Sequence, residues 1–190
     1  MTSEELVLQR INARARATLL QKHIVLVGFM GAGKSTLGSL IAGRLGRVAF
    51  DSDEVVETRA GRSIVDFFQS GEEKKFRELE ASVVRSLLRA DPAVISLGGG
   101  TLDNEQLREM VFQRSFVVNL AVSWREVQTE LPQLRQTRPM LGDRSEAEIH
   151  SLFLRRQHTY RRAHMRISMP RGDVSAAADQ LLSVLTLDSF

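Results

Sequence analysis

The segment 28–35 has residue types and a spacing that are suited to binding phosphate. It fits the pattern G-x-x-x-x-G-K-[ST] and directly follows the apolar run 24–27. Its glycines let backbone N–H groups face phosphate oxygens, Lys34 can reach the β- and γ-phosphates, and Ser35 can ligate Mg²⁺. A glycine-rich turn can match this pattern by chance, but the strand-like run before it and the helical spacing after it favour a nucleotide site.

Two carboxylates, Asp51 and Asp53, stand at the end of a second strand-like run, 48–51. Residues two apart in an extended chain point to the same side, so both side chains can face one cleft. Paired acids beside a phosphate loop indicate a metal ion and a substrate hydroxyl group. The alternative is that Asp51 or Ser52 caps a helix that begins near Asp53.

Two arginines are candidates for binding an anionic substrate. Arg156 falls on the apolar stripe of a predicted helix, and a guanidinium buried there needs a carboxylate, either internal or bound. Arg77 lies beside the apolar stripe of another helix and could instead form a solvated ion pair with Glu73 or Glu80.

Three successive glycines, 98–100, follow a third strand-like run and could present backbone amides to a substrate, although they could also form only a tight turn. Residues 123–140 are polar, contain Pro132, and include Arg125, Arg135 and Arg138. That composition indicates a mobile lid, from which an arginine can accelerate phosphoryl transfer by ~10³–10⁵. A solvated basic loop is the alternative. The histidines lack metal-ligand spacing and are interpreted as surface or core residues.

Five strand-like runs separated by helical patterns must position these groups. We predict strands at 24–27, 48–51, 93–97, 116–120 and 165–169. The alternation predicts an α/β fold in which helices cover both faces of a parallel sheet, with functional groups at the carboxyl ends of the strands. A capping box at 70–73 is expected to open a long helix, and residues 1–21 are expected to form an amphipathic extension before a domain at 22–190.

Composition limits the class of protein. The 190 residues suit one domain, and a net charge of +3 suits anionic small molecules but is too small to indicate nucleic-acid binding. The absence of cysteine excludes disulfides, thiolate zinc sites and a cysteine nucleophile. No apolar run approaches the ~20 residues of a membrane span. We therefore expect a cytoplasmic protein with no nucleic-acid or membrane partner, and a monomer is the default expectation.

Taken together, these motifs resemble those of the shikimate kinase family. The matching segments, in order from about residue 22 to 185, are 28–36, 50–53, 71–72, 76–80, 98–100, 138–141 and 156–161. The resemblance implies a three-layer α/β/α P-loop fold like that of nucleoside-monophosphate kinases, with strand order 2-3-1-4-5 and a mobile lid. It also implies Mg²⁺-dependent transfer of the γ-phosphate of ATP to the 3-hydroxyl of shikimate, in chorismate and aromatic amino-acid biosynthesis.

The resemblance implies a nucleotide site built on the phosphate loop. Its expected members are Gly31, Ala32, Gly33, Lys34, Ser35 and Thr36, with Arg138 from the lid and Arg171 near the adenine. Ser35 would bind Mg²⁺, and Asp51 would support the metal through water. Lys34 and Arg138 would act catalytically on the phosphates.

The resemblance also implies a substrate pocket. Asp53 would contact the substrate hydroxyls and orient or deprotonate the attacking one. Arg77 and Arg156 would clamp the carboxylate. The other expected members are Gly99 and Gly100, which would line the pocket, Glu80, which would hold Arg77, and Phe68 and Phe76, which would wall it.

One position departs from the family pattern. A further lid arginine is usual where this chain has Leu131, so we expect lower turnover or looser ATP binding, unless Arg135 substitutes; unchanged kinetics in Leu131→Arg would count against this. Two other functions stay open, a kinase for a related cyclic polyol acid and a non-catalytic ligand-sensing module on the same fold.

Overall fold

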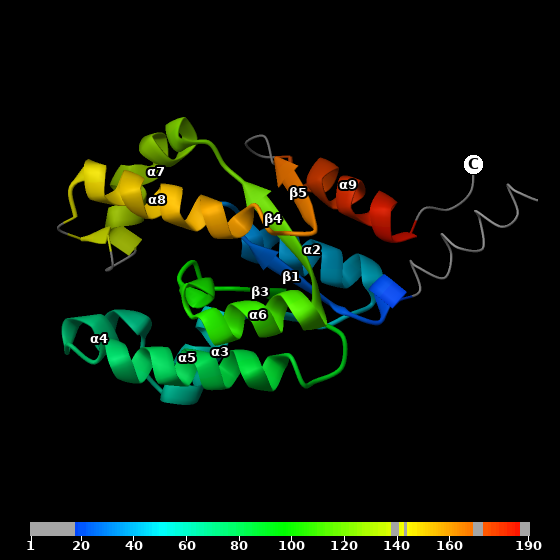
Figure 1. Cartoon of the computed structure of the whole chain (residues 1–190), viewed down its shortest axis with the longest axis horizontal. Helices are drawn as coiled ribbons and strands as arrows, with labels where there is room; N and C mark the ends of the chain where they lie inside the picture. Colours follow the sequence, from blue (N-terminus) through cyan, green and yellow to red (C-terminus); the bar gives the residue numbers. More distant parts are fainter. Residues whose placement is uncertain (1–17, 138–140, 143, 169–172, 187–190) are drawn as a thin grey trace, which may run out of the picture.

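The structure, a computed structural model, describes residues 18–137, 141–142, 144–168 and 173–186 (Figure 1). The helix expected within 1–21 lies almost entirely outside these residues and stays a prediction, as does the domain boundary at residue 22. Among the described residues, no helix combines the length and apolar composition needed to cross a membrane.

A five-stranded parallel sheet forms the centre of the described structure (Figure 1). Its strands are β1 (His23–Val27), β2 (Ala49–Asp51), β3 (Val94–Ser96), β4 (Ser115–Ala121) and β5 (Met165–Ser168). They lie in the order β2-β3-β1-β4-β5, and all four pairings are parallel. The predicted sheet and strand order are confirmed, with strand ends that agree to within one residue.

Helices cover both faces of this sheet. The described helices are α2 (Lys34–Leu45), α3 (Ser52–Ala60), α4 (Ile64–Gln69), α5 (Glu73–Leu87), a 3₁₀ turn η1 (Thr101–Asp103), α6 (Glu105–Arg114), α7 (Trp124–Thr137), α8 (Glu146–Tyr160) and α9 (Val174–Thr186). In β1, Ile24 and Leu26 pack against α2 and α9, whereas Val25 and Val27 pack on the side of α5 and α6. Because successive strand residues point to opposite faces, one buried run supplies both cores and gives the predicted three layers.

The described part of the predicted lid is helical, so the alternative of a solvated loop is wrong for residues 124–137. Val127, Leu131 and Leu134 are buried and pack with residues of the phosphate loop and α8. Their spacing of four and three residues places them on one helical face, a signal that the polar composition and Pro132 obscured.

The capping box predicted at 70–73 is wrong. The Ser70 hydroxyl closes α4 by donating to the Asp66 carbonyl (2.7 Å), and α5 begins at Glu73 without a side-chain cap from any described residue. Capping boxes instead open α4 and α8, at Ser63 with Asp66 and at Ser145 with Glu148. Ser70 was assigned to the start of α5 and not to the end of α4, because α4 has only six residues and shows no clear helical period in the sequence.

Two histidines are built into the domain and one is on its surface, as interpreted from the sequence. His23 Nδ1 accepts from the Ala93 backbone N–H (3.2 Å), and His164 Nδ1 accepts from that of Val117 (2.9 Å). Burial lowers the pKa of both imidazoles, which favours the neutral form that can accept these bonds. His158 is exposed on α8.

Candidate active site

The phosphate loop connects the buried strand β1 to α2. Gly31 (φ +79°) and Gly33 (φ +80°) adopt left-handed backbone conformations that favour glycine, and Gly33 is the N-cap of α2. Among the described residues, no side chain caps this helix start. Its first backbone N–H groups and the positive end of the helix dipole therefore suit an anion.

The side chain of Lys34 folds back toward the start of the phosphate loop. Its Nζ lies 3.1 Å from the Gly28 carbonyl oxygen and 3.4 Å from that of Phe29. A pocket of about 240 Å³ opens there, with the predicted residues Gly31, Gly33, Lys34, Ser35 and Thr36 in its wall. Ala32 is buried instead, and its N–H donates to the Phe29 carbonyl (3.2 Å).

Ser35 and Asp51 meet at the floor of this pocket. The Ser35 hydroxyl donates to Asp51 Oδ2, while Asp51 Oδ1 accepts from the Asp53 backbone N–H (2.9 Å) and caps α3. The alternative of a helix cap is therefore confirmed, and the second carboxylate oxygen still faces the phosphate loop.

This pair of oxygen ligands fits Mg²⁺. Magnesium usually keeps several waters and binds through one or two protein oxygens together with substrate phosphates. Across the described residues there is no group of three or more Asp, Glu, His or Cys side chains that could hold a metal ion. Ser35 and Asp51 could thus hold Mg²⁺ together with phosphate oxygens.

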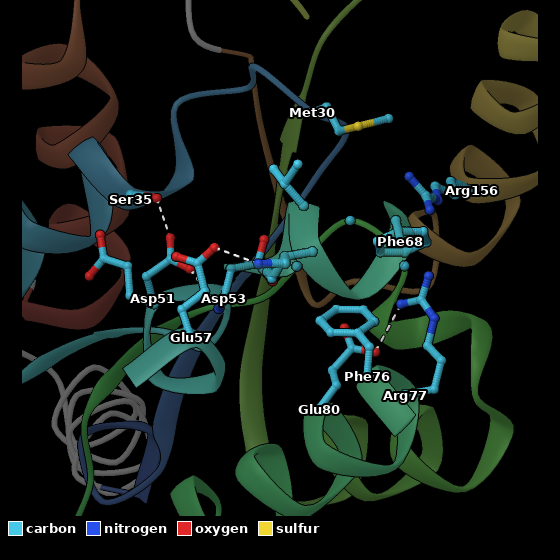
Figure 2. Close-up of a pocket in the computed structure, with 16 residues that line it drawn as sticks. Met30, Ser35, Asp51, Asp53, Glu57, Phe68, Phe76, Arg77, Glu80 and Arg156 are labelled. Atoms are coloured by element: carbon cyan, nitrogen blue, oxygen red, sulfur yellow. Dashed lines mark hydrogen bonds and ion pairs between the residues drawn. The ribbon is translucent and has the colours of Figure 1, made fainter. Parts of the chain in front are cut away.

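A second pocket of about 270 Å³ adjoins the first (Figure 2). Both pockets are lined by Met30, Ser35, Asp51, Asp53, Gly98 and Gly99. Figure 2 shows Asp51 and Asp53 on one side of the second pocket and the guanidinium groups of Arg77 and Arg156 on the other. Two small ligands held in the adjoining pockets would therefore meet beside Asp53.

Arg156 is the most unusual side chain of the site. It is 2% exposed, and its three guanidinium nitrogens have no hydrogen-bond partner among the described residues. The carboxylate of Asp103 lies 3.5 Å from Nη2 and is largely exposed, so it balances the charge without a close hydrogen bond. The predicted core position is confirmed, and the guanidinium retains its capacity to bind an anion.

Arg77 is held by the ion pairs that were considered as the alternative. Its Nη1 lies 2.9 Å from Glu80 Oε2, and its Nη2 lies 3.5 Å from Glu73 Oε1. Glu80 is buried and also accepts from the hydroxyl of Thr101 (2.7 Å). Because Glu80 fixes one edge of the guanidinium, Arg77 can present other N–H groups to the pocket, which it lines.

Glycine is required at positions 98–100 because functional side chains occupy the space that a Cβ atom would need. A Cβ atom at Gly98 would lie 2.4 Å from Asp53 Oδ1, and one at Gly99 would lie 3.0 Å from Arg156 Nη1. One at Gly100 would lie 3.0 Å from Arg77 Nη1 and 3.1 Å from Arg156 Nη2. The loop thus fills the space between the carboxylate and the two guanidinium groups, which a simple tight turn would not require.

Sequence reasoning missed three polar residues that fix the walls of the site. Ser52 Oγ accepts from the Gly98 backbone N–H (2.9 Å). Thr101 anchors Glu80, as described above, and Glu57 Oε1 accepts from the N–H of Ile64 at the start of α4 (2.8 Å). The partners of Ser52 and Thr101 are 46 and 21 positions away in the chain, so no local spacing could indicate these contacts.

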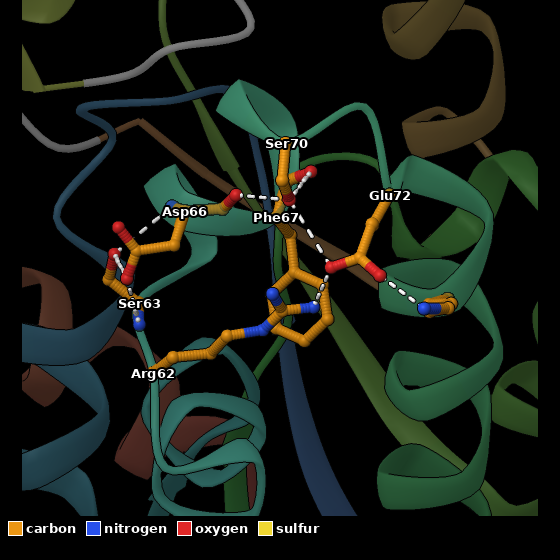
Figure 3. Close-up of polar contacts among 7 residues, drawn as sticks. Arg62, Ser63, Asp66, Phe67, Ser70 and Glu72 are labelled. Atoms are coloured by element: carbon orange, nitrogen blue, oxygen red, sulfur yellow. Dashed lines mark hydrogen bonds and ion pairs between the residues drawn. The ribbon is translucent and has the colours of Figure 1, made fainter.

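The α4 wall of the pocket is tied to α5 by a polar cluster (Figure 3). Glu72 accepts hydrogen bonds from Lys75 and Arg62, which lower its pKa to about 2. The guanidinium of Arg62 also stacks 3.8 Å above the ring of Phe67 in α4. Phe68, which lines the pocket as predicted, is thereby kept beside Phe76 of α5, with ring centroids 5.5 Å apart.

The predicted lid contacts can be followed only in part. Arg138 and Arg171 lie outside the described residues, so their roles stay predictions. Arg135 donates to the carbonyls of Gly142 and Arg144 (both 2.7 Å) and so ties the end of α7 to the next loop.

Leu131 belongs to the apolar cluster beneath the lid and is 7% exposed. Replacing it by arginine would place a charge in that cluster and disturb α7 itself. The expectation of lower turnover stays a prediction, and Leu131→Arg is not a clean test of it.

Comparisons with known proteins agree on one family. The family model described as shikimate kinase matches residues 30–186. A shikimate kinase of Geobacillus thermodenitrificans is 35% identical over 86% of this chain and 88% of its own length. Shikimate kinase from Acinetobacter baumannii in complex with shikimate superposes with a TM-score of 0.81 at 32% identity, covering 90% of this chain and 96% of that one. The enzyme from Aquifex aeolicus gives a TM-score of 0.74 at 33% identity, covering 86% and 95%.

Proposed function

The chain belongs to the shikimate kinase family, and we propose that its two adjoining pockets hold MgATP and shikimate for direct phosphoryl transfer. The enzyme transfers the γ-phosphate of ATP to the 3-hydroxyl of shikimate and releases shikimate 3-phosphate and ADP. The reaction belongs to chorismate and aromatic amino-acid biosynthesis. Its substrates are ATP and shikimate, and its metal ion is Mg²⁺.

In this proposal the phosphate loop binds the triphosphate. The backbone of Gly31 and Gly33 and the first turn of α2 surround the phosphate oxygens, and Lys34 contacts the β- and γ-phosphates. Mg²⁺ bound with ATP neutralises charge on the phosphates, and Ser35 and Asp51 are the groups that would hold it. Lys34 stabilises the charge that moves toward the leaving oxygen.

Shikimate occupies the second pocket with its carboxylate toward Arg156 and Arg77. Two guanidinium groups from different helices fix the position and the orientation of the ring. The 3-hydroxyl then lies toward Asp53, whose carboxylate orients it for attack on the γ-phosphorus and accepts its proton as the new P–O bond forms.

A single observation carries this proposal, the buried Arg156 guanidinium without a hydrogen bond from the described residues, in a pocket that shares a wall with a phosphate loop. A buried guanidinium whose N–H groups make no hydrogen bonds is costly, so a site that keeps one is suited to an anionic ligand. A carboxylate in that position and ATP in the loop bring a phosphate donor and a hydroxyl-bearing acid together.

The direct test is ADP release from MgATP in a coupled assay with and without shikimate. We expect shikimate-dependent turnover in the wild type and a KM for shikimate raised about tenfold in Arg77→Ala, since one charged hydrogen bond contributes ~1.5–3 kcal/mol. Binding of shikimate without ADP release would favour a ligand sensor. Faster turnover of another cyclic polyol acid would reassign the acceptor.

Two glycine substitutions should separate chemistry from substrate binding. Gly98→Ala forces Asp53 aside and should lower kcat about tenfold, whereas Gly100→Ala forces the two guanidinium groups aside and should raise the KM for shikimate about tenfold. Gly43→Ala in α2 is the control, because no described atom lies within 4 Å of its added Cβ. Steady-state kinetics that gave the same change in both site variants would contradict the assigned positions.

A further inference from the structure

Tyr160 contacts both the phosphate loop and the glycine loop 98–100, which line the proposed substrate pockets. It is the last residue of α8, is 2% exposed, and is the only tyrosine of the chain. Its hydroxyl oxygen lies 3.0 Å from the Gly99 carbonyl oxygen and 3.3 Å from that of Gly28. A hydroxyl has one proton, so the O–H donates mainly to Gly99 and makes a weaker, shared contact with Gly28.

The two carbonyl groups belong to different binding elements. Gly28 begins the phosphate loop, and its carbonyl oxygen also accepts from Lys34 Nζ (3.1 Å). Gly99 lies in the glycine loop, where it lines both pockets and where an added Cβ atom would lie 3.0 Å from Arg156 Nη1. One buried hydroxyl therefore touches the backbone of the donor side and that of the acceptor side.

The position of Tyr160 on α8 links it to the carboxylate clamp as well. Arg156 lies four residues earlier, so both side chains leave the same face of the helix. Any shift of α8 that moved Arg156 would also move the hydroxyl between the two loops. The helix thus places the acceptor and ties the donor loop to it.

We propose that Tyr160 is a positioning residue that sets the separation of the phosphate loop and the glycine loop, and thereby the distance between the γ-phosphate and the acceptor hydroxyl. Reacting atoms must approach within ~3–3.5 Å, and a displacement of about 1 Å can cost ~10²-fold in rate. This inference rests on the proposed function, because it assumes that the two substrates occupy these pockets.

The hydroxyl, rather than the ring, is the part that the proposal requires. The ring packs in the apolar cluster of β1, β4 and α5, where phenylalanine would serve equally well. Burial raises the pKa of the phenol to about 12, so the group stays protonated and remains a hydrogen-bond donor at neutral pH.

The test is Tyr160→Phe, which removes the hydroxyl and keeps the ring. We expect kcat to fall about tenfold to a hundredfold while the KM values for ATP and shikimate change less than about threefold. The matched control is Ser86→Ala, which deletes a hydroxyl that donates to the Ser82 carbonyl (3.0 Å) on the exposed side of α5, and it should leave kcat unchanged. A merely structural role would lower the free energy of unfolding without this selective loss of kcat.

Other results would overturn the proposal. Unchanged kcat in folded Tyr160→Phe, or a raised KM with unchanged kcat, would show that the hydroxyl does not set the reacting distance. Wild-type turnover of shikimate tests the proposed function separately, since it does not depend on this variant.

A second measurement needs no substitution and covers the case in which Tyr160→Phe does not fold. Because the chain has one tyrosine, labelling with 3-fluorotyrosine gives one ¹⁹F resonance that reports on Tyr160. MgADP alone and shikimate alone should each shift this resonance, because the hydroxyl contacts both loops. A response to only one of the two ligands would overturn the proposal.

Discussion

Replacing Arg156 by methionine should preserve or raise the stability of the fold and at the same time nearly abolish productive binding of shikimate. The guanidinium is buried with no hydrogen bond from the described residues, so its desolvation is compensated only by Asp103 at 3.5 Å. Buried charges replaced by apolar side chains of similar volume often leave the free energy of unfolding unchanged or raise it by ~1–4 kcal/mol. Loss of two charged hydrogen bonds to the substrate should lower kcat/KM for shikimate by about 10²–10⁴.

The two effects can be measured on one preparation. Urea unfolding gives the change in the free energy of unfolding, and steady-state kinetics give kcat/KM for shikimate and the KM for ATP, which should not change. Arg155→Met is the matched control, since Arg155 is the exposed neighbour on α8 and should alter neither quantity appreciably. A loss of stability in Arg156→Met would mean that the ion pair with Asp103 outweighs the desolvation of the guanidinium.

Arg156 is expected to serve substrate binding and not stability, and this is why sequence periodicity could identify it as a candidate site residue. A charged residue on an apolar stripe contradicts the local pattern, and such conflicts are expected at functional sites. Arg77 was harder to assign, because it follows the ordinary spacing of helical ion pairs and indeed forms them with Glu73 and Glu80. The structure adds that one of these partners is buried, which a spacing rule cannot indicate.

Features encoded by contiguous residues were predicted well. The buried strand before Gly28 and the helix that follows the phosphate loop were predicted from apolar spacing, and all five strands were located in the same way. The helical structure of residues 124–137 in the lid segment was not predicted, because only a few apolar residues carry the helical signal among many polar ones. Ser52 and Tyr160 could not be assigned a contact, since their hydroxyl groups bind backbone atoms that only the folded sheet brings near.

Asp53 stands where the two pockets meet, so its removal should affect turnover rather than nucleotide binding. It lines both pockets, and a Cβ atom added at Gly98 would lie 2.4 Å from its Oδ1. Asparagine keeps the size of the side chain and one acceptor oxygen but cannot take up the proton of the 3-hydroxyl. Because a positioned base contributes ~10²–10⁴ to the rate, we expect kcat of Asp53→Asn to fall by about that factor.

The size of the fall in kcat of Asp53→Asn would also show whether Asp53 accepts the proton of the 3-hydroxyl. Phosphoryl transfer through a loose transition state needs little help from a base, so a loss of only about tenfold would mean that Asp53 mainly orients the hydroxyl. Glu54→Gln removes the same charge from the next residue of α3 and should cause a much smaller loss, which separates a specific contact from the general field of the helix. Kinetics at varied ATP decide the assignment, because equal losses in kcat and in ATP affinity would place Asp53 with the nucleotide rather than with the attacking hydroxyl.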